Sequence, residues 1–332
     1  MKRYLLIAMI MGFGFAGAAA QDDTEPTKPV RRVLVEEYTG TWCGNCPRGY
    51  VALKWIEKDY GDRQISVSYH VDDALDVGGA AFYGVGAVPQ GSADRWGLVD
   101  PYYGTPGFGV DLGIYYDIDR ALAEEAICSI DIEVEENGDR AKVIPHIRFI
   151  KDEDHRKYQM GYVIKADSTA SLYPQENYYA GVKEAEGTPL EEVANWPKVK
   201  RGLSYYDVAI DVRGFKGIEG SLPATIKAGV DYTPSFNINL ADRVMAFYKS
   251  QMTVVVFVVN KSNGRILNAN TYYFGEKKEE NAAVEDVAVE IEVTGSESYD
   301  LSGRRVSNPD KGIFIRVDRL SDGSTKATKV AY

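Results

Sequence analysis

Trp42-Cys43-Gly44-Asn45-Cys46-Pro47 places two thiols two residues apart, between an expected strand and an expected helix. Residues 33–38 before it form a short apolar strand candidate, and residues 48–60 after it carry apolar side chains near helical spacing. Both cysteines would then lie at a helix N-terminus, where free backbone N–H groups and the helix dipole favour a thiolate. The pattern predicts redox chemistry, with Cys43 as the exposed, attacking thiol and Cys46 as the resolving thiol.

The next segments extend this pattern in a way that resembles thioredoxin. Residues 64–70 alternate apolar and polar side chains, as a second strand would. Residues 81–89 end in Val88-Pro89 and resemble the thioredoxin segment that leads into a cis-proline facing the cysteines. With a closing helix over residues 112–125, the resemblance covers about residues 30–126. It implies that Trp42, Val88 and Pro89 bind an extended substrate segment beside Cys43.

An acid upstream of the motif is a further catalytic candidate. Glu37 lies six residues before Cys43, the spacing at which thioredoxins carry a buried acid that helps to deprotonate the resolving thiol. Glu36 competes for this role if the strand has a one-residue insertion. Burial would raise the pKa of either carboxyl and suit it as a proton acceptor, whereas acids at strand ends are usually solvated.

Two simpler interpretations of the cysteine pair stay open. The pair could form a purely structural disulfide, or it could contribute to a zinc site. Zinc would need two more ligands, and the sequence has no second paired-cysteine motif and no His-x-x-x-His arrangement. We therefore expect neither a metal nor another cofactor. His70 with Asp72 and Asp73 is interpreted as a strand end with a helix cap rather than as a metal site.

Length and composition limit the number of domains and the kinds of partner that the chain can have. A chain of 332 residues with 45% hydrophobic content is expected to form two or three domains. Residues 1–20 have the layout of a cleaved secretory signal, and no later segment approaches a membrane span. Loss of Lys2 and Arg3 would take the formal charge from −11 to −13, which argues against a nucleic-acid partner. Export would leave Cys128 unpaired, as a small buried core residue or as a further resolving thiol.

Alternating runs replace the helical pattern after residue 126. Residues 130–134 and 141–150 flank an Asn-Gly turn and predict one hairpin, and residues 253–259 and 266–274 predict a second. Tyrosine-rich runs at residues 158–165, 205–212 and 232–240 predict further strands. We expect an antiparallel β-sandwich over residues 127–275, with loops or short helices near residues 173–196.

The C-terminal region is expected to form a third unit. A charged linker at residues 276–284 precedes a small β-domain over residues 285–332. Its elements Tyr299-Asp300-Leu301-Ser302-Gly303 and Lys311-Gly312-Ile313-Phe314 resemble those of the C-terminal sorting domain of type IX secretion substrates. It is shorter than that domain and lacks the early Pro-Asn-Pro strand. The resemblance implies outer-membrane secretion machinery as a partner.

Taken together, these features resemble the outer membrane protein 28 family of Gram-negative envelopes. The resemblance implies an α/β plus all-β chain, with a thioredoxin-like N-terminal domain followed by a sandwich, located in the periplasm, the outer membrane or at the cell surface. One hypothesis is an envelope thiol-disulfide oxidoreductase whose partner is a protein thiol or disulfide. The other is a non-enzymic surface interaction protein that uses the thioredoxin-like domain as a scaffold. A covered Cys43 sulfur would favour the second.

Overall fold

The computed structural model describes residues 28–79, 84–103, 113–153, 158–167, 169–170, 174–275, 293–299, 305–306, 313–320 and 325–331. The chain divides into two compact units, residues 1–276 and residues 277–332. The expected signal, the expected linker and residues 81–83 of the proline segment lie outside the described residues. In the described part, no helix is long and apolar enough to cross a membrane.

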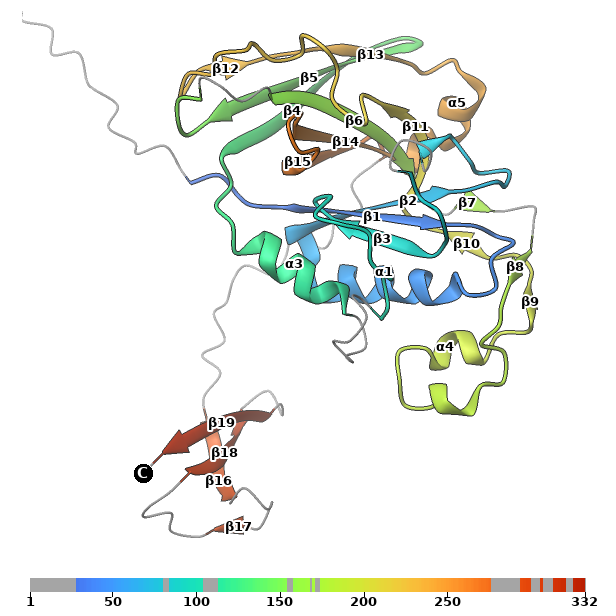
Figure 1. The fold of residues 1–332 in the computed structure, drawn as a ribbon, viewed down its shortest axis with the longest axis vertical. Coiled ribbons are helices and arrows are strands. Elements are labelled where there is room, and N and C mark those ends of the chain that lie inside the picture. The colour runs from blue at the N-terminus through green and yellow to red at the C-terminus, as the bar shows by residue number, and fades with distance from the viewer. Residues whose placement is uncertain are drawn as a thin grey trace, which may run out of the picture. The chain divides into compact units, whose positions relative to one another are not determined.

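The first unit is built on a seven-stranded sheet of order β15-β14-β6-β11-β2-β1-β3 (Figure 1). The strands are β1 Val33–Thr39, β2 Gln64–His70, β3 Gln90–Ala93, β6 Tyr158–Ala166, β11 Val208–Arg213, β14 Met252–Asn260 and β15 Ile266–Tyr273. β1 and β2 run parallel and are connected through helix α1, Pro47–Tyr60, whereas β3 pairs antiparallel with β1. The result is a mixed α/β architecture dominated by sheets.

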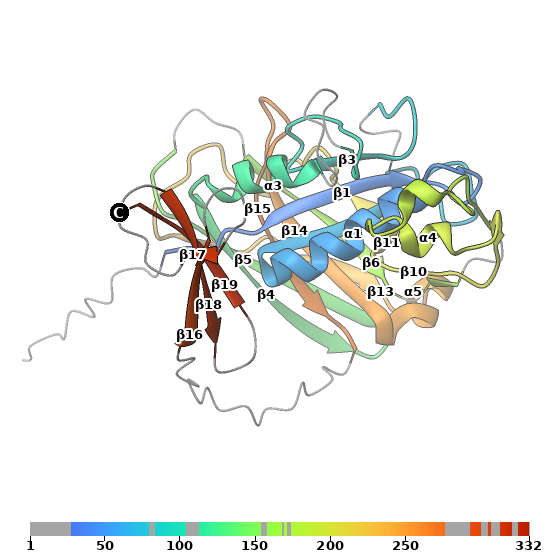
Figure 2. The ribbon, with the colours of Figure 1, turned by 90° about the horizontal axis from the view of Figure 1, so that it is seen from below.

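Helices cover one face of this sheet at its β1–β3 end (Figure 2). α1 and α3, Ile114–Leu122, bury Leu53, Ile56 and Ile118 against Val33 and Val35 of β1. α1 has proline in its first turn, where the missing N–H removes no intrahelical hydrogen bond. The helix ends at Tyr60, and the next residue is Gly61, whose φ of 51° favours glycine. Both expected helices are present, and the second is shorter than its pattern indicated.

A second, antiparallel sheet packs over β6 and β14 on the other side of the molecule. It contains β4 Cys128–Asn137, β5 Arg140–Phe149, β12 Asp231–Tyr232 and β13 Phe236–Asn239. The core between the two sheets includes Phe149, Tyr158 and Val256. The β4–β5 and β14–β15 pairings confirm both expected hairpins. Gly138 lies in the first turn with a φ of 57°.

The large sheet runs across the expected boundary between residues 126 and 127. β11 joins β2 in parallel at Val208 and Ser68, and the Ser68 N–H donates to the carbonyl of Asp207 at 2.7 Å. Every residue of β2 is buried, and β2 would be an exposed edge strand without this partner. The second sheet therefore faces a layer that continues into the sheet that carries the cysteine motif.

Short elements fill the region beyond the ends of β1 and β2. β7 Thr169–Ala170 pairs with β10 Ser204–Tyr205, and β8 Gln175–Glu176 pairs with β9 Val199–Lys200. Helix α4, Glu191–Ala194, packs Val193 near Val51 and Ala52 of α1. Helix α5, Arg243–Tyr248, begins at Asp242, whose carboxylate accepts from the Val244 and Met245 N–H groups. Single 3₁₀ turns occur at Gly61–Arg63, Lys183–Ala185 and Lys249–Gln251.

The second unit contains a four-stranded antiparallel sheet of order β17-β16-β18-β19. Its strands are β16 Val293–Tyr299, β17 Arg305–Val306, β18 Ile313–Leu320 and β19 Thr325–Ala331. Leu301, Gly303, Lys311 and Gly312 of the sorting-domain resemblance lie outside the described residues.

The division into two units predicts that residues 277–332 are dispensable for the stability of the first unit. Truncation after residue 276 is expected to change the free energy of unfolding of the remainder by less than about 1 kcal/mol, because few contacts cross a domain boundary. Urea unfolding of the full and truncated chains, followed by tryptophan fluorescence, measures this difference. A loss of more than about 2 kcal/mol would show that the second unit is part of the first unit's core.

Candidate functional site

Cys43 and Cys46 are joined by a disulfide at the start of α1. The turn is fixed by backbone hydrogen bonds: the Cys43 N–H donates to Gly40 and the Cys46 N–H donates to Cys43, each at 3.1 Å. The Cys46 carbonyl accepts from the Gly49 N–H at 2.9 Å, as the first turn of the helix requires. Both cysteines are buried, with 6% of Cys43 and 1% of Cys46 exposed. The expectation of an exposed Cys43 is therefore wrong: it is slightly more exposed than Cys46, but both are buried.

The expected proline segment reaches the disulfide. The Val88–Pro89 peptide bond is cis, as the sequence predicted. The Val88 carbonyl oxygen lies 3.5 Å from the Cys43 Sγ atom. A reduced Cys43 thiol at this position can donate to that carbonyl, so Val88 and Cys43 form one continuous site.

Trp42 lies beside the disulfide and is half exposed. Its indole Nε1–H donates to the Val71 carbonyl at 2.7 Å. A Cβ added at Gly40 would lie 2.9 Å from this nitrogen, so the absence of a side chain there lets the indole pack on the loop. The ring is thus held in place while one part of it faces solvent.

Glu37 is buried in β1 and lies on the same side of the sheet as Cys46. Its Oε2 accepts from the Ser68 hydroxyl at 3.1 Å, and its Oε1 has no hydrogen-bond partner. Burial raises the pKa of Glu37 to about 8, the Ser68 hydrogen bond lowers it, and the charges of Asp207 and Asp100 raise it further. At neutral pH this carboxyl is therefore mostly protonated.

Glu36 faces the opposite side of β1 and is also buried. Its two oxygens accept from the Arg95 Nε and Nη2 atoms at 2.7 Å each, and Oε1 also accepts from the Tyr69 hydroxyl. Of the two acids, Glu37 is thus the one that shares surroundings with the cysteine pair. The general expectation that strand acids are solvated is wrong for both.

A distant segment covers the cysteine loop, and no local sequence pattern predicted this contact. Gln175 donates from Nε2 to the Cys43 carbonyl at 2.9 Å. The Glu176 N–H donates to Thr41 and the Tyr178 N–H donates to Gly44, both at 2.8 Å. The Tyr178 ring packs so closely that a Cβ at Gly44 would lie 2.3 Å from it. Within the motif, glycine is needed at this position to admit the ring.

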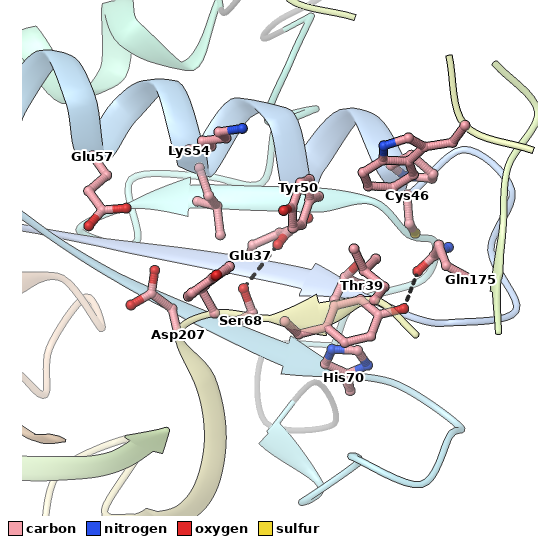
Figure 3. A pocket seen from close by; sticks show the side chains of 16 residues that line it. Glu37, Thr39, Cys46, Tyr50, Lys54, Glu57, Ser68, His70, Gln175 and Asp207 are labelled. Carbon is pink, nitrogen blue, oxygen red and sulfur yellow. Dashed lines mark hydrogen bonds between the residues drawn. The ribbon is translucent and has the colours of Figure 1, made fainter. Parts of the chain in front are cut away.

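A cavity of about 300 Å³ lies behind Cys46 (Figure 3). Strands β1 and β2 supply Glu37, Ser68 and His70, and α1 supplies Tyr50 and Glu57 among others. Trp196, Leu203 and Tyr205–Asp207 complete the lining. The cavity therefore brings together an expected resolving thiol, an expected acid and residues that no local pattern linked to them.

The remaining candidates have structural partners. The His70 Nδ1 atom lies 2.7 Å from Asp73 Oδ2, and the Asp73 carboxylate also accepts from the Thr41 and Leu75 N–H groups. These bonds hold a turn rather than cap a helix. Within the described residues, no group of three or more His, Cys, Asp or Glu side chains is placed to hold a metal ion. Cys128 is free and buried, which confirms it as a core residue, and burial raises its pKa to about 12.

No family model and no curated protein matches the chain. Among solved structures, HBP35 of Porphyromonas gingivalis aligns with a TM-score of 0.50 and 16% identity, over 92% of this chain and 99% of that chain. A protein of Agrobacterium tumefaciens aligns with a TM-score of 0.42 and 16% identity, over 76% of this chain and 98% of that chain. At such identity the likeness to HBP35 concerns the fold alone.

The environment of Glu37 predicts a pH-dependent stability. Because its pKa is raised from 4.5 to about 8, its proton stabilises the folded chain fully below about pH 4.5, and this contribution is lost as the pH rises through about 8. Glu37→Gln has nearly the same shape but no titratable proton. The stability of the oxidised wild type relative to this variant should therefore fall by about 2–4 kcal/mol between about pH 5 and about pH 8.5. Urea unfolding at each pH measures this. A difference that does not vary with pH would contradict the assignment.

The contact between Glu37 and α1 predicts that alanine at position 49 destabilises the folded protein. A Cβ at Gly49 would lie 1.9 Å from Glu37 Oε1, so Gly49→Ala should cost about 1–3 kcal/mol although alanine favours helices. Gly97→Ala, where nothing lies within 4 Å, is the matched control. In a Glu37→Ala background the cost of Gly49→Ala should shrink, and thermal unfolding of the four proteins tests this coupling. An unchanged cost would place the clash elsewhere.

Proposed function

We propose that the protein is an exported thiol-disulfide oxidoreductase that acts on protein disulfides. The observation that supports this most is the Cys43–Cys46 disulfide at the N-terminus of α1, with the Val88 carbonyl 3.5 Å from the Cys43 sulfur. The parallel β1–α1–β2 unit and the antiparallel β3 after Pro89 are what a thioredoxin-like domain requires. That domain is proposed to cover about residues 30–126.

The proposed exchange uses the two sulfurs in order. In the reduced protein, the Cys43 thiolate attacks one sulfur of a substrate disulfide, and the other substrate sulfur leaves as a thiolate. The Cys46 thiolate then attacks the Cys43 sulfur, which forms the Cys43–Cys46 disulfide and releases the second substrate thiolate. Trp42, Val88 and Pro89 would hold the substrate segment during the mixed-disulfide stage. Run in reverse, the same steps oxidise a substrate dithiol.

Glu37 is proposed as the proton acceptor for Cys46. Burial raises the pKa of Glu37 from 4.5 to about 8, which makes its carboxylate a stronger base than an exposed one and better able to take a proton from a thiol. Glu37 and Cys46 line the same cavity, which supports this pairing. Cys43 does not line that cavity, and its first deprotonation would rely on the helix N-terminus instead.

A second candidate function is supported by the covering of the motif. Only 6% of Cys43 is exposed, and the segment at Gln175–Tyr178 is hydrogen-bonded to the cysteine loop. A disulfide enclosed in this way also suits a non-enzymic interaction protein that uses the domain as a scaffold. Oxidoreductase activity requires that a substrate sulfur can reach Cys43 past Trp42 and Val88.

We further propose an envelope location. The signal-like residues 1–20, the acidic charge and the resemblance to the outer membrane protein 28 family support export to the periplasm, the outer membrane or the cell surface. The small β-sheet of the second unit suits a sorting role with the outer-membrane secretion machinery, because it forms a unit of its own.

Cysteine variants test the proposed exchange. With reduced protein and a disulfide-bonded substrate such as insulin, Cys43→Ser should abolish exchange, and Cys46→Ser should accumulate a mixed disulfide that is visible on a non-reducing gel. Cys128→Ser, which removes the buried free thiol, is the matched control and should retain activity.

Alkylation of the thiols distinguishes the oxidoreductase from the non-enzymic scaffold. After reduction, Cys43 of the oxidoreductase should react with iodoacetamide faster than a denatured control thiol at about pH 6, because a lowered pKa leaves more thiolate. Absence of trapped species, together with a Cys43 rate no higher than the control, would refute the oxidoreductase and support the scaffold.

A further inference from the structure

The cavity behind Cys46 has the composition of a small-molecule site. Its volume of about 300 Å³ falls within the range of about 300–1,000 Å³ found for ligand pockets. Its aromatic and aliphatic lining includes Tyr50, Leu53, Trp196, Leu203, Tyr205 and Tyr206. Tyr206 is half exposed and, with Lys54 and Glu57 of α1, lies where the cavity can open to solvent.

Two polar atoms in the cavity lining lack partners. Glu37 is 2% exposed and His70 is 1% exposed, and neither Glu37 Oε1 nor His70 Nε2 makes a hydrogen bond within the described residues. Each such group costs about 1–3 kcal/mol when it is buried unsatisfied. His70 contacts the Asp73 carboxylate through Nδ1, so in the neutral ring Nδ1 carries the proton and Nε2 is an acceptor. An ionised Glu37 is also an acceptor, and the pair therefore calls for a ligand that donates.

The charges along the cavity favour a cation. Glu37, Glu57 and Asp207 line it as carboxyls, and Figure 3 shows them coming from β1, from α1 and from the segment before β11. The lining Lys54 is bound to Glu192 at 2.7 Å, and Asp207 is paired with Lys165. Glu37 and Glu57 form no ion pair within the described part of the chain. Burial disfavours the charge of both, and a cation placed between them would restore it.

We propose that this cavity binds a small aromatic amine as its ammonium form, with the ring against the Tyr50 and Trp196 walls and the ammonium beside Glu37. An ammonium can donate to the unpartnered Glu37 Oε1, and aromatic faces attract both rings and cations. The proposal concerns binding to the oxidised protein and does not depend on thiol exchange.

Binding should depend on pH through Glu37. The titratable and charged groups that line the cavity with it are Tyr50, Lys54, Glu57, His70, Tyr205, Tyr206 and Asp207, and Asp100 also acts on its charge. Since the ammonium stabilises the ionised carboxyl, binding near pH 7 should release close to one proton per ligand, and affinity should increase from about pH 6 to about pH 8.

Isothermal titration calorimetry with tyramine tests the proposal. Tyramine should bind the oxidised protein at least about tenfold more tightly than its alcohol analogue, 2-(4-hydroxyphenyl)ethanol, and the anionic 3-(4-hydroxyphenyl)propionate should bind most weakly. Glu37→Gln should weaken tyramine by at least about tenfold and leave the alcohol unchanged. Titrations in phosphate and in Tris report the released proton, which the variant should not release. Glu184→Gln, an exposed acid that does not line the cavity, is the matched control.

A second variant tests the cavity without changing Glu37. Leu203→Trp should fill part of the cavity and weaken tyramine and the alcohol together, with a circular dichroism spectrum like the wild type. Equal affinities for tyramine and the alcohol, or a tyramine affinity that Glu37→Gln leaves unchanged, would overturn the proposal. These measurements are made on oxidised protein, so a failure of thiol exchange in the cysteine variants would not affect them.

Discussion

The burial of two adjacent carboxyls in β1 is the constraint around which the first unit is organised. All seven residues of β1 are buried, and successive side chains of a strand point to opposite faces. Glu36 and Glu37 therefore need separate solutions on opposite sides of the sheet. Glu36 receives a bidentate ion pair from Arg95, whereas Glu37 receives one hydroxyl and holds a proton instead. On one face the charge is paired, and on the other the raised pKa keeps the carboxyl neutral near pH 7 while Oε1 stays without a hydrogen-bond partner.

The ion pair on the Glu36 face also ties the two halves of the first unit together. Asp94 and Arg95 adopt φ values of 48° and 59°, which turns the chain after β3 so that the guanidinium reaches back under the sheet. That guanidinium stacks on Phe215 at 3.7 Å and lies 5.0 Å from the Phe257 ring of β14. A buried pair of this kind stabilises only when its remaining donors are satisfied, and the Phe215 carbonyl accepts another of them. Segments from both sides of the expected boundary at residues 126 and 127 thus pack around one buried cation, the Arg95 guanidinium.

Local patterns were enough to predict the parts of the site that are close in sequence. The cysteine spacing, the apolar period of α1 and the Asn-Gly turn each act over a few residues, and the helix and hairpins follow from them. The pairing of β2 with β11 and the cover at Gln175 could not be predicted, because the residues involved lie far apart in the chain and carry no turn or capping signal. Gln175 contacts a carbonyl 132 residues away. Glu37 was a prediction from spacing, but the cavity beside it is created by this same distant segment.

The two cysteines differ in their surroundings although they share one turn of chain. Cys43 lies beside the Val88 backbone near the surface, and Cys46 lines an interior cavity with an uncharged carboxyl. If Glu37 accepts the Cys46 proton and also anchors a bound ammonium, the two uses compete for one carboxylate. An ammonium favours ionised Glu37 but lowers its basicity, so it opposes protonation by the Cys46 thiol. By thermodynamic linkage, the ligand changes the equilibrium between the disulfide and the reduced pair by some factor, and reduction changes the affinity for the ligand by the same factor. The cavity and the disulfide would then behave as two coupled sites joined through Glu37.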